Sequence, residues 1–559
     1  MNLLGKGMDK SFWNTVRESE SFAGYREVLN DAWNKAISRG DIRALRYSEF
    51  KMFFVDGNRE IYQNSYFQNL EGMTAAALMS LVYPEEEQYL NYLMDAIYAV
   101  CDEYTWCLPA HQPSFEENNN CHIDLFAALT GFYLSEIHTL LNDRLEPLIL
   151  SRIEAELERR IFTPFLAWEP YWWWETCTSN WVAVCMGSVA CTFMLMRPEK
   201  ARELIPRFQK SMAGFLLGFS DEGVCYEGGD YWNYGVGHFL AYADMLRTFT
   251  DGKENYFTDP RVKKIATFYN KIFIGDNVIA NFADCGANKS LAMGRMHYLK
   301  AEYPDEMKNV SFENSKFSMT YSFCEGFRQA LWYYDTEKAE NANVSSEFYA
   351  TSAEWYIKRT ENYGFAAKGG NNNEYHNHND VGHFIFAKGN RQILCDLGVG
   401  VYTRQYFGHE RYGILETSAR GHSVPIIDGE YQMNGKEYAA RDFKYENGKV
   451  TLDIAGAYKN LSASEKIERS FTLSDSGVTL TDKFSFDSER AVVERFVTRI
   501  EPNTDTRGTV YVDGTAIKYD ANAWSVEVSF EPSGTENRCC YMIDFRPIIK
   551  TDVFTAEIG

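Results

Sequence analysis

The histidines of this chain are concentrated in one short segment, and this is its clearest sign of chemistry. Five of the ten histidines lie between residues 376 and 422, at positions 376, 378, 383, 409 and 422. His376 and His378 are two residues apart, so on a strand they would share one face at about 7 Å. On a bend they would diverge, one toward a substrate and the other toward a metal.

A carboxylate in the same segment makes a metal site one interpretation of this cluster. Asp396 follows an apolar stretch at residues 392–395, and His422 is expected to open a further strand. Two imidazoles and one carboxylate form a common open zinc site. No local zinc motif is satisfied, so the alternative is a hydrogen-bonded polar cluster in a sandwich core, with His383 as a purely structural member.

A second candidate segment is rich in glycine and aromatic residues. Residues 221–238 read DEGVCYEGGDYWNYGVGH and precede an apolar helix, with Tyr234 at its entrance. Such a segment can hold a phenol over a groove, or it can be a turn packed by its own aromatic side chains. Glu227 and Asp230 could instead be the paired carboxylates of a glycoside hydrolase.

The third candidate segment, residues 171–190, reads YWWWETCTSNWVAVCMGSVA. Three consecutive tryptophans cannot all be buried on one helical face, so at least one is expected at a surface or cleft. Asn180 is placed to cap the helix that begins at Trp181, or to direct its amide toward a ligand, since helix N-termini favour anions.

Two kinds of periodicity divide the chain that must position these residues. Up to about residue 300, apolar residues recur at helical spacing and are separated by Pro, Gly and Asp turns, which indicates stacked helical hairpins. After about residue 340, apolar and polar residues alternate between turns, which is typical of a β-sandwich. We therefore expect a helical domain at 1–340 and an antiparallel sandwich at 341–559.

The composition limits the class of partner. The net charge of −22 excludes a basic nucleic-acid footprint and disfavours a basic membrane patch. An acidic ligand would need a locally positive site. The twelve cysteines show no CxxC pair and are expected to be reduced. No signal-peptide pattern opens the sequence, so a cytoplasmic location is expected, although a trimmed secretory signal is the alternative. The oligomeric state is not indicated.

Taken together, the motifs resemble those of the heparinase II/III-type polysaccharide lyases. The resemblance rests on motifs in order between about residues 100 and 430: SNW at 179–181, YEGGDYWNYG at 226–235, HNHND at 376–380, CDLG at 395–398 and GHSVPIIDG at 421–429. It implies an incomplete (α/α) toroid followed by an antiparallel β-sandwich. It also implies a lyase that cleaves uronic-acid-containing glycans by β-elimination and leaves 4,5-unsaturated uronate ends.

The resemblance also implies roles for individual residues. Tyr234, His376 and Asn180 correspond to catalytic positions: the tyrosine as acid, the histidine as base, and the amide as the group that holds the substrate carboxylate. Tyr231 is the fallback for the catalytic tyrosine. The remaining expected contacts with substrate are Tyr231, Trp181, Tyr402, Arg404 and Tyr412, and the expected ligands of a structural zinc ion are His378, Asp396 and His422. Several family members carry a histidine at or beside Asn180, where this chain has Trp181.

β-Elimination explains why such residues are needed. The C5 proton of a uronate is a weak acid until the neighbouring carboxylate is neutralised, after which a base removes the proton and an acid protonates the leaving oxygen. The implied substrates are glycosaminoglycans such as heparan sulfate, chondroitin or hyaluronan, or alginate-type oligosaccharides. Two rivals remain: an (α/α)-barrel glycoside hydrolase using Glu227, Asp230 or Asp124, and a non-catalytic glycan-binding protein.

Overall fold

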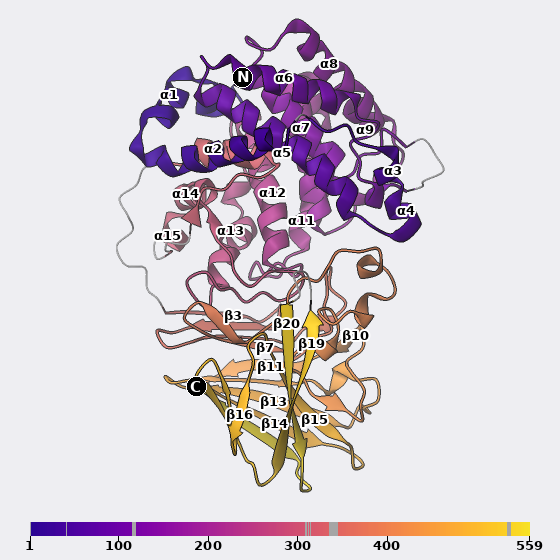
Figure 1. Cartoon of the computed structure of the whole chain (residues 1–559), viewed down its shortest axis with the longest axis vertical. Coiled ribbons are helices and arrows are strands. Elements are labelled where there is room, and N and C mark those ends of the chain that lie inside the picture. The colour runs from indigo at the N-terminus through magenta and orange to yellow at the C-terminus, as the bar shows by residue number, and fades with distance from the viewer. Residues whose placement is uncertain are drawn as a thin grey trace. The chain divides into compact units, whose positions relative to one another are not determined.

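The chain divides into two compact units, one helical and one rich in strands (Figure 1). The computed structural model describes residues 2–40, 42–113, 119–307, 310, 312, 315–334, 345–533 and 538–559. The first unit comprises residues 1–218, 233–263 and 290–340, and the second comprises 219–232, 264–289 and 341–559. The expected domain boundary, between residues 340 and 341, lies outside the described residues.

Some helices begin at a capping side chain, as at Asp9, Asp124 and Ser322, or at a proline, as at Pro147 and Pro198. The helices are α1 (Lys10–Glu18), α2 (Ala23–Ser38), α3 (Tyr47–Phe50), α4 (Met52–Asp56), α5 (Glu60–Val82), α6 (Glu87–Asp102), α7 (Leu125–Leu140), α8 (Pro147–Leu157), α9 (Thr163–Ala167), α10 (Gly187–Met196), α11 (Pro198–Leu217), α12 (Gly229–Phe249), α13 (Pro260–Thr267), α14 (Met293–Glu302), α15 (Pro304–Met307) and α16 (Phe323–Leu331). Among the described residues, none of these helices has the length and apolar character that spanning a bilayer requires.

Helix α7 shows how the sequence fixes an element that matters for the site. Asp124 is its N-cap, and its carboxylate accepts hydrogen bonds from the backbone N–H groups of Phe126 and Ala127 at 3.1 and 2.7 Å. These bonds satisfy donors that have no partner inside the helix. The same carboxylate is completely buried and has a further partner, His111, which is described below.

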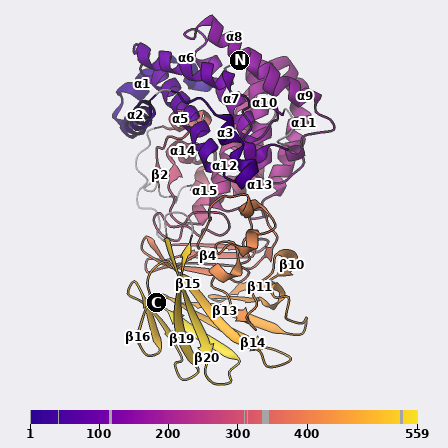
Figure 2. The same ribbon diagram turned by 45° about the vertical axis from the view of Figure 1, so that its right-hand side comes forward.

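Two segments wind as π-helix, in which each backbone hydrogen bond spans one residue more than in an α-helix. They cover Glu158–Phe162, between α8 and α9, and Val182–Met186, which runs directly into α10. The second π segment follows Asn180 and Trp181, and α10 and α11 then lie side by side (Figure 2). Single π turns occur frequently at functional sites, because an extra residue re-aims the side chains before it.

The second unit is built from antiparallel sheets. One sheet has the order β3-β4-β5-β7-β8, a second β11-β12-β13-β14-β21-β18-β17-β16, and a third β19-β20-β15-β9. The strands are β3 (Ser346–Ala350), β4 (Trp355–Arg359), β5 (Gly364–Lys368), β7 (Phe384–Lys388), β8 (Arg391–Leu394), β9 (Ile426–Ile427), β11 (Arg441–Glu446), β12 (Lys449–Asp453), β13 (Lys466–Leu473), β14 (Val478–Ser485), β15 (Val492–Thr498), β16 (Asn503–Thr506), β17 (Thr509–Val512), β18 (Thr515–Tyr519), β19 (Trp524–Ser533), β20 (Arg538–Pro547) and β21 (Val553–Ile558).

Aromatic side chains from the three sheets form one core. Phe384 of β7 lies 5.2 Å from Phe471 of β13 and 5.3 Å from Phe496 of β15, measured between ring centroids. The inward-facing residues of β13 and β14 are buried at every second position, as the alternating sequence predicts. The predicted order of helices followed by antiparallel strands is therefore confirmed.

A buried ion cluster ties this core to the loops that carry the histidines. The guanidinium of Arg469 is fully buried and pairs with Asp482 and Glu494 at 2.6 and 2.5 Å. It also donates to the backbone carbonyls of Gly382 and Ser423, which adjoin His383 and His422. A buried charge is tolerated only when it is paired in this way. The bonds of Arg469 to Gly382 and Ser423 therefore hold the loops that carry His383 and His422 against the core.

Candidate active site and metal centre

His376 and His378 lie on a bend and meet the same carboxylate. Nδ1 of His376 donates to Oδ2 of Asp284 at 2.8 Å, and Nε2 of His378 donates to Oδ1 at 3.0 Å. His376 has a φ of +57°, a left-handed conformation that is uncommon for residues other than glycine. Of the two geometries considered, the bend is the one observed, and the strained backbone orients the two imidazoles differently.

Asp284 is the centre of this arrangement. Its carboxylate is completely buried and also receives Nη2 of Arg411 at 3.0 and 3.1 Å and the hydroxyl of Tyr406. Burial alone would raise the pKa of the Asp284 carboxyl, but the hydrogen bonds from His376 and His378 hold that pKa well below its usual value. Asp284 therefore stays an anion that fixes which nitrogen of each histidine carries a proton.

The other nitrogen of His376, Nε2, faces the carboxylate of Glu227. It lies 3.5 Å from the carboxylate of Glu227, and the imidazole stacks on the ring of Tyr231 with centroids 3.8 Å apart. The hydroxyl of Tyr231 shares a hydrogen bond of 2.7 Å with that of Tyr402, and Tyr402 donates to Asp284 at 3.5 Å. Tyr231 and Tyr402, both expected at the site, thus lie in one network with His376.

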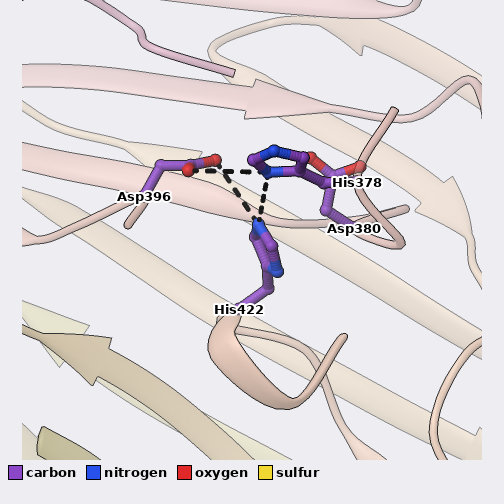
Figure 3. Close-up of side chains that lie close together, drawn as sticks. All are labelled: His378, Asp380, Asp396 and His422. Atoms are coloured by element: carbon purple, nitrogen blue, oxygen red, sulfur yellow. Dashed lines mark hydrogen bonds and ion pairs between the residues drawn. The ribbon is translucent and has the colours of Figure 1, made fainter. Parts of the chain in front are cut away.

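The three expected metal ligands come together in the strand-rich unit (Figure 3). Nδ1 of His378 lies 3.3 Å from Nε2 of His422, and the Asp396 carboxylate lies 4.0 Å from the first nitrogen and 3.7 Å from the second. All three side chains are fully buried. Asp380 is the fourth residue of the cluster and its second carboxylate, although one of its oxygens pairs with Lys368 at 2.7 Å.

The chemistry of these donors fits a metal ion. Because Nε2 of His378 donates to Asp284, and Nδ1 of His422 donates to the carbonyl of Ser418 at 2.8 Å, each neutral ring directs a lone pair at the other. Two nitrogens bound to one tetrahedral zinc at about 2.05 Å would be about 3.3 Å apart, which matches the 3.3 Å between them. Oδ2 of Asp396 is buried without a hydrogen-bond partner among the described residues. The cluster can therefore hold a metal.

His383 lies beside this cluster and is fully buried. Its Nδ1 accepts from the backbone N–H of Ser423 at 2.9 Å, which leaves the proton on Nε2, 3.4 Å from the Asp396 carboxylate. Burial lowers the pKa of His383 well below its usual value, so the ring stays neutral. Support of a metal-binding carboxylate by a neighbouring donor is common in metal sites. His422 does not open a strand; it lies in the loop before β9.

The helical unit contains Asn180, Trp181 and Tyr234. The helix begins at Asn180 itself, one residue earlier than predicted, so Asn180 is not its N-cap. A Cβ added at Gly235 would lie 3.1 Å from Cβ of Asn180, so the buried amide packs beside the residue that follows Tyr234. Helix α12 begins at Gly229, which puts Tyr231 in its first turn and Tyr234 in its second.

The hydroxyl of Tyr234 is shielded from solvent. Burial raises the pKa of this phenol well above its usual value, and the nearby Tyr321 and Asp124 raise it further. Tyr234 is therefore neutral, with a proton to give. In the tryptophan run, Trp172 and Trp174 are buried whereas Trp173 is 54% exposed, which confirms that one of the three is at the surface.

Tyr412 and Arg404, the two other expected substrate contacts, have different surroundings. The hydroxyl of Tyr412 accepts from the Asn377 amide at 3.4 Å, next to the histidine bend. Arg404 is exposed, and among the described residues it makes no hydrogen bond or ion pair; Arg411, seven residues later, is the arginine that reaches Asp284. The loop at 402–412 offers two arginines, and the sequence did not distinguish them.

The carboxylates proposed for a glycoside hydrolase have separate partners. Glu227 lies against His376, whereas Asp230 pairs with Lys289 at 2.5 Å and accepts from the backbone of Gly286 at 3.1 Å. Asp124 caps α7 and binds His111. An inverting or retaining hydrolase needs two carboxyl groups on opposite sides of one bond, and these contacts do not favour that role.

The chain is similar to known proteins both in sequence and in structure. Residues 346–547 match the family model described as Heparinase II/III-like, C-terminal. No curated protein sequence matches the chain. The structure resembles that of heparinase III (TM-score 0.64, 15% identity, 89% of this chain and 77% of that one). It also resembles a mutant heparan sulfate lyase from Pedobacter heparinus (0.63, 15%, 100% and 87%) and a chondroitin AC lyase from Streptomyces coelicolor in complex with chondroitin sulphate (0.58, 11%, 98% and 82%).

These matches confirm the resemblance to heparinase II/III-type polysaccharide lyases that the motifs indicated. They also confirm the expected fold class, an incomplete (α/α) toroid followed by an antiparallel β-sandwich. The enzyme class expected from the sequence, a carbon–oxygen lyase acting on polysaccharides, agrees with the names of these matches.

Proposed function

We propose that this protein cleaves uronic-acid-containing glycans by β-elimination and leaves 4,5-unsaturated uronate ends. The proposed substrate is a glycosaminoglycan such as heparan sulfate, chondroitin or hyaluronan, or an alginate-type oligosaccharide. The observation that carries the proposal is the pairing of His376 with Asp284: one imidazole nitrogen is fixed as a donor, and the other is left with a lone pair that can accept a proton.

In this proposal three side chains carry the chemistry. Asn180 holds the uronate carboxylate by hydrogen bonding, which makes the C5 proton removable. Nε2 of His376 takes that proton, and the resulting imidazolium is stabilised by the anionic Asp284 and Glu227 on either side. The neutral phenol of Tyr234 gives its proton to the departing O4, because its raised pKa keeps it protonated. The bond from C4 to the glycosidic oxygen then breaks as the C4–C5 double bond forms.

Tyr231 has a different role in this proposal from that of Tyr234. Its ring lies flat on His376 and its hydroxyl is engaged with Tyr402, so it restrains the base. The metal is proposed to be zinc, held by His378, Asp396 and His422. Bound there it would supply a fixed positive charge that links three loops and steadies the bend carrying His376.

The test is an absorbance assay over a panel of uronate glycans with sizing of the products. A 4,5-unsaturated uronate absorbs in the near ultraviolet, whereas the product of hydrolysis does not. New reducing ends without that absorbance would establish a hydrolase instead. Binding without any new chain ends would indicate a glycan-binding protein, and either outcome would reject the lyase.

A further inference from the structure

The helical unit contains a large cavity whose lining includes none of the residues proposed for catalysis. It lies between α3, α5 and the end of α6 and has a volume of about 750 Å³. Ligand sites commonly have volumes of about 300–1,000 Å³ and are lined by aromatic side chains with a few polar groups. This cavity has that size and, as described next, that kind of lining.

Aromatic rings form one wall of the cavity. Phe50 of α3 meets the rings of Tyr62 and Tyr104 edge-on, with centroids 5.5 and 6.1 Å apart. Tyr47 and Tyr104, which also line the cavity, are 68% and 54% exposed. Rings that are held against one another and open on one side offer flat surfaces on which the C–H face of a sugar ring can pack.

A buried carboxyl group forms a polar part of the lining. Glu103 follows α6 and is 8% exposed, and neither of its carboxyl oxygens has a hydrogen-bond partner among the described residues. The amide of Asn69 beside it is bonded instead to the backbone of Arg43, at 2.9 and 3.2 Å. Burial raises the pKa of Glu103 to about 8, so at neutral pH the group is mainly a neutral acid that can both donate and accept a hydrogen bond. A buried polar group without a partner is destabilising, and the hydroxyl groups of a ligand would supply the missing partners.

The charged residues that line the cavity leave one positive charge without a counterion. Arg43 pairs with Glu49, and Asp102 pairs with Arg152 at 2.7 Å. Arg46 is exposed, and within the described part of the chain its guanidinium makes no hydrogen bond or ion pair. In a chain with a net charge of −22, a local cation of this kind favours an anionic ligand. The planar fork of N–H donors on a guanidinium matches the two oxygens of a carboxylate.

We propose that this cavity is a second binding site for acidic oligosaccharides. A uronate ring packs on Tyr47 and Tyr104, and Arg46 binds its carboxylate. Glu103 bonds the hydroxyl groups of the same sugar. The inference rests on the proposed function, because its ligand belongs to the substrate class assigned to the protein. The cavity holds the glycan through sugar units that take no part in the elimination.

Hydrogen exchange with an unsulfated uronate tetrasaccharide tests the site. The measurement uses Tyr234→Phe, in which the expected loss of turnover leaves the oligosaccharide intact. Backbone amides of residues 42–50 and 99–104 should exchange more slowly when the tetrasaccharide is added, and titration of this protection gives the affinity of the cavity.

Substitutions in the cavity should weaken that affinity in proportion to the contact that is lost. Arg46→Gln should lower it about ten- to a hundredfold, because charge-assisted hydrogen bonds disappear. Tyr104→Ala should lower it about two- to tenfold, whereas Tyr104→Phe, which keeps the ring, should bind like the parent protein.

Two exposed residues of the same unit provide matched controls. Arg197→Gln removes an arginine that pairs with Glu158, and Tyr98→Ala removes a tyrosine of α6 that is 45% exposed; neither should change the protection of residues 42–50. The carboxyl-reduced tetrasaccharide, which retains its hydroxyl groups, should bind at least tenfold more weakly than the acidic one. Equal protection by the two glycans, or equal affinities of Arg46→Gln and Arg197→Gln, would overturn the proposal.

Failure of the lyase proposal would look different from failure of this one. If no glycan of the panel gives an ultraviolet-absorbing product, yet the tetrasaccharide protects residues 42–50 and Arg46→Gln loses that protection, the cavity is a glycan site and the lyase is rejected. If the product forms but the tetrasaccharide protects neither segment, the lyase stands and the second site is rejected.

Discussion

Replacing Asp284 by asparagine should change which ring nitrogen of His376, the proposed base, carries the proton. Oδ1 of Asp284 accepts from His378, Tyr406 and Arg411, whereas Oδ2 accepts from His376 and Arg411 and, at 3.5 Å, from Tyr402. An amide has one acceptor oxygen, and the donors around Oδ1 should attract it there, because Tyr402 lies at the limit of hydrogen-bond distance from Oδ2 and can donate to Tyr231 instead. The NH₂ group then faces Nδ1 of His376, two donors meet, and the imidazole must move its proton to Nε2.

A proton on Nε2 removes the lone pair that takes the C5 proton. General base catalysis is worth about 10²–10⁴-fold, so kcat of Asp284→Asn should fall by that factor. His378 retains its acceptor, so metal affinity should fall by only about 10- to 100-fold, or about 1.4–2.7 kcal/mol. The ultraviolet assay measures the first effect and elemental analysis after dialysis against graded chelator the second.

The matched control is Asp276→Asn, an exposed aspartate of the same unit that pairs with Arg359. It should leave both quantities unchanged. Near-wild-type kcat in Asp284→Asn, with folding verified by circular dichroism, would refute the reasoning, since it would mean that His376 does not need a fixed proton. Loss of metal with full kcat would separate the carboxylate from catalysis.

Three further predictions concern other parts of the molecule. Tyr234→Phe should lower kcat at least a hundredfold without unfolding the protein, whereas Tyr231→Phe, which keeps the stacked ring, should lose less than tenfold. His422→Ala should abolish the retention of zinc measured by elemental analysis, whereas His409→Ala, an exposed histidine of the same unit, should retain it. Burial raises the pKa of Glu103 to about 8, so folding favours its protonated form, and stability should fall as pH rises from about 4.5 to 8; Glu103→Gln should flatten the melting temperature across that range.

Each of these three predictions has a control or an outcome that would contradict it. Asp102→Asn alters the exposed neighbour of Glu103 and should leave the pH dependence of melting intact. A steeper loss of stability with pH in Glu103→Gln would contradict the assigned protonation. Equal losses of kcat in the two tyrosine variants would move the acid to Tyr231. Full zinc content in His422→Ala would remove that residue from the ligand set.

The histidine cluster could be predicted because its members are close in sequence and chemically distinct. His378, Asp396 and His422 meet as expected, and they lie in the loops before β7, after β8 and before β9. Asp284 was missed because it lies about ninety residues earlier, in the unremarkable stretch FADCG, and nothing local marks it as buried. The contact of His111 with Trp181 was missed for the same reason: it joins residues far apart in the chain, and a single sequence carries no record of it.

The fold was predictable to the level of element type, with errors at the ends. The stretch 449–458 alternates throughout, yet β12 ends at Asp453, because the Asp453 side chain accepts from the backbone of Ala455 and starts a turn. The stretch 261–274 carries apolar residues at helical spacing throughout, yet α13 ends at Thr267 and continues as a 3-10 turn. The π segments were invisible to a period of 3.6 residues, since one extra residue shifts the apolar pattern only slightly.

The directions in which the side chains before the π segment at Val182–Met186 point depend on how many residues that segment contains. Removing any single residue from it would let the segment relax to ordinary α-helix, at little expense in buried apolar contacts. Everything upstream on that helix would then turn by about 100° relative to α10. Asn180 and Trp181 would then lie on a different face of the helix, although neither residue is replaced. A one-residue deletion within Val182–Met186 is therefore expected to abolish activity, whereas conservative substitutions within the segment are not.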